Sequence, residues 1–250
     1  MNNKIYQNIL NSVLEKEKLL AVLIDPDKFL VDKVGAFIEK VNASIATHIF
    51  VGGSTVDDFV TGILVVEIKK HTKLPVVLFP GDVTQITNKA NALLFLSLLS
   101  GRNPEYLIGK HVQAVSKLKK STLEVIPTGY LLIEGGKVTA VERVTGEKPL
   151  SRSDVQEIVD TAFAGQLLGM KLIYLEAGSG AKAPLTNEII TEVKKALKLP
   201  IIVGGGIRSK QQLDAVYKAG ADIAVIGTAF EQDELFFEEL KKDKYYENIS

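Results

Sequence analysis

Eight short apolar runs recur along this chain, and each of them stops at a glycine, proline or aspartate cluster. Runs of strand length bounded by such residues are typical of β-strands. In chain order the runs are residues 19–25, 48–51, 76–79, 92–99, 123–126, 172–175, 201–203 and 223–226. The chain is therefore expected to contain eight strands spread over its whole length.

Most of these runs are separated by segments in which apolar residues recur at three- and four-residue spacing, as in Val34, Phe37, Ile38 and Val41. That spacing predicts amphipathic helices. Strands that are apolar on both faces and alternate with helices form parallel sheets covered by helices. Because there are eight strand-helix units in 250 residues, the pattern predicts one (β/α)8 barrel, a TIM barrel, as a single domain over residues 1–250.

Two segments depart from the regular repeat. Residues 82–91 are too few and too polar for a covering helix, so the third helix is expected to be reduced or missing and that flank thinly covered. After the fifth run, residues 130–133 and 137–144 flank the turn Glu134-Gly135-Gly136. This arrangement predicts a β-hairpin insertion after strand five, on the rim of the barrel.

The charge balance limits the choice of partner. Thirty basic and thirty acidic residues cancel, which gives no support to nucleic acid or an anionic membrane as the main partner. With no cysteine, thiolate metal sites and cysteine nucleophiles are excluded. The first 18 residues lack the apolar core of a signal peptide, and the longest apolar run is far shorter than the roughly 20 residues of a transmembrane helix. We therefore expect a cytoplasmic protein without a transmembrane segment.

Glycine clusters follow the last three strands, and together they predict a phosphate site. Gly178-Ser179-Gly180, Gly204-Gly205-Gly206 and Gly227-Thr228 lie where strands should turn into helices. Glycines there leave backbone N–H groups accessible, and helix N-termini add partial positive charge. One such cluster ordinarily serves only a tight turn. Three on adjacent loops favour a bound phosphate, the usual ligand of this part of the fold.

Two acidic residues are candidates for chemistry on the same rim. Glu176 lies between an apolar run and the Gly-Ser-Gly loop, where a carboxylate could accept a hydroxyl proton from a bound phosphoester. Asp25 ends the first strand, and Ser54 follows the second. Such sparse oxygen ligands suit Mg²⁺, whose shell is usually completed by water and substrate phosphates. Lys28 and Arg208 are left without a role, since each is equally explained as a solvated or helix-capping residue.

Sequence motifs at these positions resemble a known family, the geranylgeranylglyceryl phosphate synthases and their bacterial relatives. The matching segments span nearly the whole chain, and Tyr174 to Gly180 is the most specific. They are Leu23-Ile24-Asp25-Pro26-Asp27-Lys28, Val51-Gly52-Gly53-Ser54, Phe79-Pro80-Gly81, Tyr174-Leu175-Glu176-Ala177-Gly178-Ser179-Gly180, Val203-Gly204-Gly205-Gly206-Ile207-Arg208 and Gly227-Thr228-Ala229-Phe230. Many archaeal members carry Lys where this chain has Leu23, so it resembles the second branch, in which bacterial sequences are found.

The resemblance implies a reaction. The sn-3 hydroxyl of sn-glycerol 1-phosphate attacks C1 of a polyprenyl diphosphate, usually geranylgeranyl, to form an ether and release diphosphate in ether-lipid biosynthesis. Glu176 would take the proton, and Asp25 and Ser54 would bind Mg²⁺. Glycerol 1-phosphate would be held by Tyr174, Leu175, Glu176, Ala177, Gly178, Ser179, Gly180, Gly204, Gly205, Gly206, Gly227 and Thr228.

The lipid chain would then need a long apolar groove, which the thinly covered flank is expected to provide, with Phe95, Leu98 or Tyr106 limiting its depth. The family also implies a homo-oligomer, and a lipid product implies transient membrane contact at release. Two other functions stay open. One is isomerase or lyase chemistry on a phosphorylated metabolite, disfavoured because the fifth run ends at Pro127-Thr128-Gly129 without an acid. The other is a non-catalytic barrel that binds a phosphoester.

Overall fold

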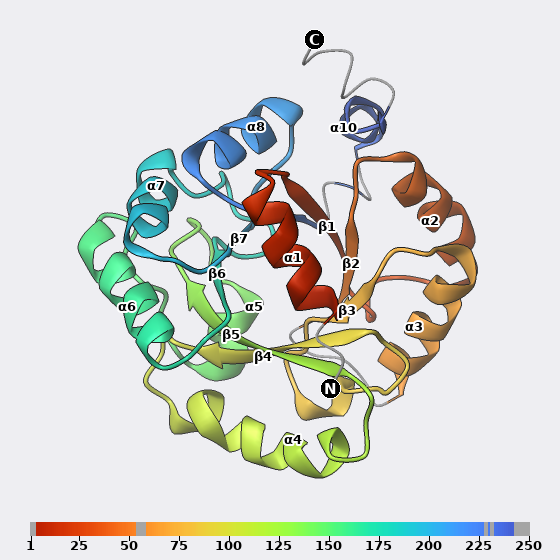
Figure 1. Cartoon of the computed structure of the whole chain (residues 1–250), viewed down its shortest axis with the longest axis horizontal. Coiled ribbons are helices and arrows are strands. Elements are labelled where there is room, and N and C mark those ends of the chain that lie inside the picture. Colours follow the sequence, from red (N-terminus) through yellow and green to blue (C-terminus); the bar gives the residue numbers. More distant parts are fainter. Residues whose placement is uncertain (1–3, 54–58, 228–229, 231–232, 243–250) are drawn as a thin grey trace.

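The computed structural model describes residues 4–53, 59–227, 230 and 233–242. Within these residues eight parallel strands form a closed barrel in the order β1 to β8, and β8 pairs with β1 (Figure 1). The strands are β1 (Leu19–Ile24), β2 (His48–Val51), β3 (Val76–Leu78), β4 (Ala92–Leu98), β5 (Glu124–Leu132), β6 (Leu172–Glu176), β7 (Ile201–Gly204) and β8 (Ile223–Ile226). The predicted (β/α)8 barrel is therefore confirmed.

Helices surround the barrel, and one more lies across its end (Figure 1). None of the described helices is both long enough and apolar enough to cross a bilayer. The α-helices are α1 (Lys4–Leu14), α2 (Val34–Ala43), α3 (Val60–His71), α4 (Lys110–Leu118), α5 (Ala140–Thr145), α6 (Val155–Leu167), α7 (Asn187–Ala196), α8 (Lys210–Ala219) and α10 (Glu234–Glu239). Short helical turns are η1 (Val31–Lys33), η2 (Val83–Gln85) and η3 (Glu105–Gly109), the last with π-helical bonding.

Alternation along each strand divides the core into two clusters. Ile173 and Leu175 of β6 pack between the barrel and its helices, whereas Leu172 and Tyr174 face the barrel interior. Successive side chains of a strand point to opposite faces, so a fully apolar strand supplies both clusters. The runs read in the sequence are apolar throughout for this reason.

Helix α1 closes the N-terminal end of the barrel. The backbone N–H groups of Ile5 and Tyr6 donate to the Glu124 carboxylate at the start of β5, at 2.7 and 2.9 Å. Glu124 is only 3% exposed, and Ile9 packs into the interior cluster. A carboxylate at a helix N-terminus satisfies free N–H groups and complements the helix dipole. The cavity described below therefore opens at the other end.

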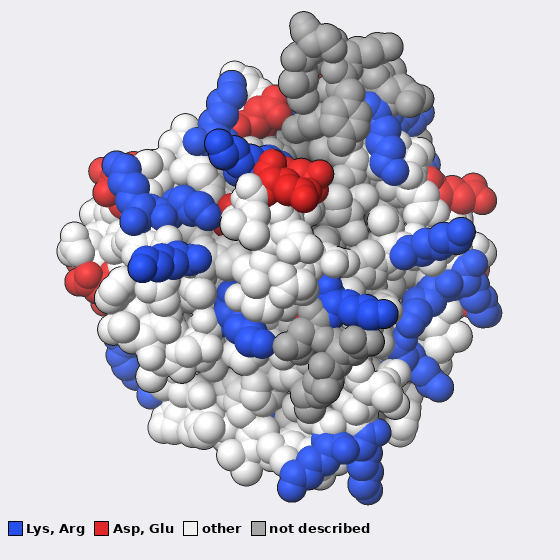
Figure 2. All heavy atoms as spheres, in the orientation of Figure 1, with Lys and Arg blue, Asp and Glu red and all other residues white. Residues whose placement is uncertain are grey.

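The face covered by α1 shows more Lys and Arg than Asp and Glu (Figure 2). Helix C-termini of a (β/α)8 barrel lie at this end, and several last turns carry lysines: Lys40, Lys69, Lys70, Lys117, Lys194, Lys195 and Lys218. Cations at helix C-termini complement the dipole. Much of the basic charge is thus placed away from the strand C-termini, and an anion site there must depend on local groups.

The flank after β3 has no covering α-helix, as predicted. The single turn η2 stands in its place. Helix α4 reaches over this gap, because Lys110 contacts the Asp82 carboxylate at 2.6 Å and Lys117 donates to the Val83 carbonyl at 2.8 Å. Helix α4 is thus held over the region after β3, where the cavity described below extends.

The predicted hairpin after strand five is wrong. Strand β5 continues through Pro127 to Leu132 and pairs in parallel with β6, Tyr130 opposite Tyr174. Residues 140–145 form α5, where Thr139 and Glu142 make a reciprocal capping box. The Thr-x-x-Glu spacing was the sequence signal for a helix start. The glycine turn therefore leads from a strand into a helix and not into a second strand.

Candidate active site

A cavity of about 770 Å³ opens at the C-terminal ends of the strands. Its polar part is lined by Asp25, Glu176 and Ser179. From there it continues over the short strand β3 to the outer side of β4, where Phe95 and Ala114 line it beneath α4. One space thus joins a polar centre to an apolar channel. The channel exists because no helix follows β3.

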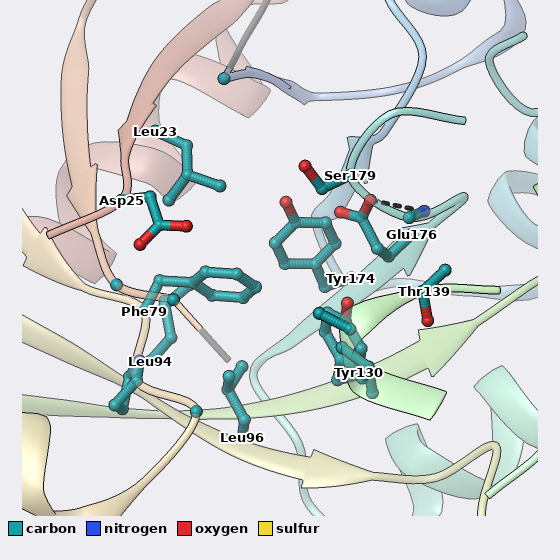
Figure 3. A pocket seen from close by; sticks show the side chains of 18 of the residues that line it. Leu23, Asp25, Phe79, Leu94, Leu96, Tyr130, Thr139, Tyr174, Glu176 and Ser179 are labelled. Atoms are coloured by element: carbon teal, nitrogen blue, oxygen red, sulfur yellow. Dashed lines mark hydrogen bonds between the residues drawn. The ribbon is translucent and has the colours of Figure 1, made fainter. Parts of the chain in front are cut away.

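Glu176 is the most perturbed acid of the cavity. It ends β6, is 7% exposed, and its carboxylate accepts the backbone N–H of Gly178 at 2.7 Å (Figure 3). Burial raises the pKa of Glu176 to about 7, an effect that the neighbouring Tyr174 hydroxyl and the Gly178 N–H partly offset. A carboxyl group with a pKa near neutrality is suited to exchange protons with a bound substrate.

Glycines on β7 make room for this carboxylate. A Cβ at Gly204 would lie 2.5 Å from both the Glu176 carboxylate and the Tyr174 hydroxyl. Gly205 has φ +86°, and a Cβ there would meet Glu176 at 2.6 Å and the Gly178 amide at 2.9 Å. Only glycine fits both the left-handed backbone and this close approach. Gly204 at the end of β7 and Gly205 just after it therefore enclose Glu176, as well as leaving N–H groups accessible to an anion.

Tyr174 adds a second buried polar group beside Glu176. Its hydroxyl lies next to the Glu176 carboxylate (Figure 3). Burial raises the pKa of Tyr174 well above its ordinary value. The phenol therefore keeps its proton beside the Glu176 carboxylate.

Asp25 lies across the cavity mouth from Glu176 (Figure 3). Its side chain is 23% exposed and contacts the Lys28 ammonium at 2.5 Å. A Cβ at Gly53 would lie 2.5 Å from the carboxylate, so the chain that follows β2 lies close against Asp25. Lys28 is 65% exposed, and such ion pairs are weak. Asp25 can therefore exchange Lys28 for another cation.

The other residues predicted for the phosphate site fall into three groups. Gly178, Ser179, Gly180, Gly205, Gly206 and Gly227 line the cavity. The side chains of Leu175 and Ala177 point instead into the core behind the strand, which leaves only their backbone atoms for binding. Thr228 lies outside the described residues, as does Ser54, which was predicted as a Mg²⁺ ligand.

The sequence analysis disfavoured an isomerase because no acidic residue followed the fifth strand, but it placed the end of that strand too early. Strand β5 ends at Leu132 and not at Pro127, so Glu134 is the acid that follows it. The Glu134 carboxylate, however, accepts hydrogen bonds from Ser151 and the Arg152 amide and does not line the cavity. Strand β5 therefore supplies no acidic side chain to the cavity, because Glu134 is turned towards Ser151 and Arg152.

Sequence reasoning missed the aromatic side chains at the centre. Phe79 was noted only as part of a motif, and Tyr130 was placed in the hairpin. Both line the cavity beside Tyr174. A usable signal was present, because Ile126, Thr128 and Tyr130 alternate along one face of a continuous strand.

Arg208 links two of the loops. Its guanidinium donates to the Ala181 carbonyl at 3.0 Å, and its backbone N–H donates to Gln212 at 2.7 Å. It also lines the cavity. The structure thus gives Arg208 a structural task in joining the loops after β6 and β7.

Any reaction that uses Glu176 as a base should lose rate in acid. Since the carboxylate is the active form and its pKa is raised to about 7, kcat/KM should fall about tenfold per pH unit below that value and level off above it. A pH profile of kcat/KM at constant ionic strength measures this. A profile that stays flat down to pH ~5 would contradict the assignment, because an ordinary Glu titrates near 4.3.

Comparison with known proteins agrees with these features. The chain is 54% identical over 231 residues to the geranylgeranylglyceryl phosphate synthase of Zunongwangia profunda, covering 92% of this chain and 98% of that protein. It is 53% identical to that of Flavobacterium johnsoniae over 234 residues, covering 94% of this chain and 96% of the relative.

Among solved structures, (S)-3-O-geranylgeranylglyceryl phosphate synthase from Thermoplasma acidophilum, in complex with its substrate sn-glycerol-1-phosphate, superposes with a TM-score of 0.89. The two chains are 32% identical, with 96% of this chain and 97% of that one covered. The PcrB family matches residues 11–247. The resemblance seen in the motifs is thus confirmed, and the chain belongs to the PcrB family.

Proposed function

We propose that this protein is a prenyltransferase that joins the sn-3 hydroxyl of sn-glycerol 1-phosphate to C1 of geranylgeranyl diphosphate, or of a related polyprenyl diphosphate, and releases diphosphate. The observation that carries the proposal is the single cavity that leads from Glu176 to an apolar channel beneath α4. A phosphorylated polyol fits the polar end, and a prenyl chain fits the apolar end. Membership of the PcrB family and similarity to named synthases support the same reaction.

Each end of the cavity has a distinct task. The N–H groups of the glycine loops after β6 and β7 hold the phosphate of glycerol 1-phosphate, which directs its free hydroxyl towards Glu176. The Glu176 carboxylate then takes the hydroxyl proton as the new C–O bond forms. Because Glu176 is buried and its pKa lies near 7, it is basic enough to accept that proton and weak enough as an acid to hold it.

Mg²⁺ is the cofactor that we propose, with Asp25 as a protein ligand and Ser54 as a second. The accessible Asp25 carboxylate fits this role, and no group of three or more potential acidic or imidazole ligands occurs in the described part of the chain. Mg²⁺ commonly binds one or two protein oxygens and completes its shell with substrate phosphates. When bound, it would neutralise charge on the leaving diphosphate.

The test is transfer of label into lipid. Protein, Mg²⁺ and labelled sn-glycerol 1-phosphate are incubated with prenyl diphosphates of increasing length, and label extractable into organic solvent is counted. We expect extractable label that requires Mg²⁺ and is absent when sn-glycerol 3-phosphate, the mirror image, replaces the substrate. Folded protein that yields no such label with any chain length would overturn the proposal.

Residues beneath α4 should set the chain length of the product. Phe95 contacts His111 edge-on at 4.4 Å, and the Tyr106 hydroxyl donates to the Val144 carbonyl at 3.2 Å, so both bound the channel. Replacing either with Ala should shift kcat/KM towards a chain one isoprene unit longer by about tenfold. Competition between two prenyl diphosphates measures this. Phe163→Ala, on the outer surface of α6, is the control, and unchanged selectivity in both channel variants and in Leu98→Ala would contradict the role.

We also propose that the protein is a cytoplasmic homo-oligomer that contacts the membrane transiently when it releases its lipid product. The exposed side chains of Ile108, Val112 and Val115 follow one another at three- and four-residue spacing along η3 and α4. Self-association through this face would bury them. Sedimentation velocity of the wild type and of Val112→Lys would test that arrangement.

A further inference from the structure

Lys28 is a basic residue of the cavity that lies directly beside the proposed metal ligand Asp25. Its ammonium contacts the Asp25 carboxylate at 2.5 Å, and its backbone N–H donates to the Asp25 carbonyl at 3.1 Å. The side chain lines the cavity and is largely exposed to solvent. The backbone bond therefore fixes the start of the side chain, while its flexible stem leaves the ammonium able to move within the cavity mouth.

The other basic side chains that line the cavity, within the part of the chain that the structure describes, are placed differently. Three of them donate to oxygens away from Asp25: Lys110 to the Asp82 carboxylate, Arg143 to the Val138 carbonyl and Arg208 to the Ala181 carbonyl. Lys137 lies on the loop after β5. That loop packs against the Glu176 side of the cavity, since a Cβ at Gly178 would lie 2.3 Å from the Thr139 side chain. Lys28 is therefore the described cation that can serve both Asp25 and a ligand beside it.

Asp25 lies on the side of the cavity that leads into the apolar channel. Gly53, which lies close against the Asp25 carboxylate, exchanges hydrogen bonds with the Gln85 side chain at 3.2 and 2.7 Å. Gln85 ends η2, the turn that borders the channel, and Figure 3 shows Glu176 and Ser179 on the opposite side. A prenyl diphosphate whose chain lies in the channel therefore brings its diphosphate group to Asp25 and Lys28.

The diphosphate group gains negative charge in the proposed reaction. The electron pair of the breaking C1–O bond leaves with the diphosphate, the glycerol oxygen bonds to C1, and its proton passes to Glu176. Mg²⁺ at Asp25 would neutralise part of the charge on the diphosphate, but Asp25 itself offsets part of the charge of the metal. An ammonium at the same place supplies further positive charge and N–H donors for phosphate oxygens.

We propose that Lys28 exchanges partners: it is the counter-ion of Asp25 until a metal ion binds there, and it then donates to the diphosphate group of the prenyl substrate. The inference rests on the proposed function. Exchange costs little, because an ion pair with an exposed lysine is weak. Lys28 thus opposes binding of the metal alone and favours binding of the metal together with diphosphate.

Two binding measurements on Lys28→Met test the exchange, and they should change in opposite directions. The affinity for inorganic diphosphate in the presence of Mg²⁺, measured by calorimetry, should fall about tenfold or more. The affinity for Mn²⁺ without diphosphate, measured from the electron paramagnetic resonance signal of the free ion, should rise by up to about fivefold, because the competing ammonium is gone. Lys28→Arg should keep most of the diphosphate affinity. If Lys28 only held Asp25 in place, its removal would weaken Mn²⁺ binding.

Lys33→Met is the matched control. Lys33 is exposed at the end of η1 and is not among the residues that line the cavity, so both affinities should stay at their wild-type values. Unchanged diphosphate affinity in Lys28→Met, or Mn²⁺ affinity that stays the same or falls, would overturn the exchange alone, provided that the wild type transfers prenyl groups. Absence of transfer by the wild type would overturn the proposed function and this inference together.

Discussion

Replacing Glu176 with Gln is expected to lower kcat for prenyl transfer by about a hundred- to ten-thousandfold. The amide has nearly the shape of the carboxylate, and its oxygen can still accept the Gly178 N–H that Glu176 accepts at 2.7 Å. It cannot take up the proton of the attacking hydroxyl. Because we propose that backbone N–H groups of neighbouring loops hold the phosphate, the affinity for sn-glycerol 1-phosphate should change little. Steady-state kinetics and calorimetric titration with sn-glycerol 1-phosphate separate the two effects.

A matched variant tests whether the loss belongs to this position. Glu188 lies exposed in the first turn of α7, so Glu188→Gln removes the same charge away from the cavity and should leave kcat as it is. If Glu176→Gln retained more than about a tenth of wild-type kcat, proton transfer to Glu176 could not be an important step.

Among substitutions of the described strand-end glycines by Ala, Gly52→Ala should destabilise the protein most. A Cβ at Gly52 would lie 1.7 Å from the Phe79 carbonyl oxygen, which is backbone and cannot rotate away. The strands β2 and β3 would have to separate where β3 is only three residues long. We expect a loss in the free energy of unfolding on the order of 3 kcal/mol or more, measured by urea denaturation.

Gly227→Ala is the control for that measurement. Gly227 also follows a strand, but among the described residues the nearest atom to a Cβ there is the carbonyl oxygen of Leu23, at 3.7 Å. Its unfolding free energy should stay within about 0.5 kcal/mol of the wild type. Equal losses in the two variants would show that the close approach of Gly52 to Phe79 does not decide the stability.

The fold was predictable because its strands are short and buried on both faces. Each apolar run ended at a turn residue, which located the strands to within a residue or two in most cases. The exception was β5, where Pro127 and Gly129 were taken as its end. Proline lacks an N–H group, yet Pro127 is accommodated inside the strand and its carbonyl accepts the Lys171 N–H. The low β-propensity of proline and glycine is therefore outweighed here by the pairing of β5 with β4 and β6.

The site was predictable where chemistry is concentrated in one segment. Glu176 and the glycines follow their strands directly, so their place on the rim depended only on the strand ends. The cluster of Phe79, Tyr130 and Tyr174 comes from three strands, and its formation depends on register, such as Tyr130 opposite Tyr174. The register between two strands cannot be read from a single sequence. The capping of α1 by Glu124 was missed for the same reason, since the partners are 119 and 118 positions apart.

The bond between α1 and Glu124 also bears on the order of events during synthesis. Helix α1 is made first, but the carboxylate that secures its N-terminus arrives only with the start of β5, 119 residues after Ile5. The barrel itself closes through pairing of Leu19 with Ile223, almost the last strand made. Contacts of such long sequence separation form late and slow the folding of a chain. Strand β1 can pair with β2 early, but its other edge and the N-terminus of α1 keep their polar backbone groups without these partners until the later strands have been made.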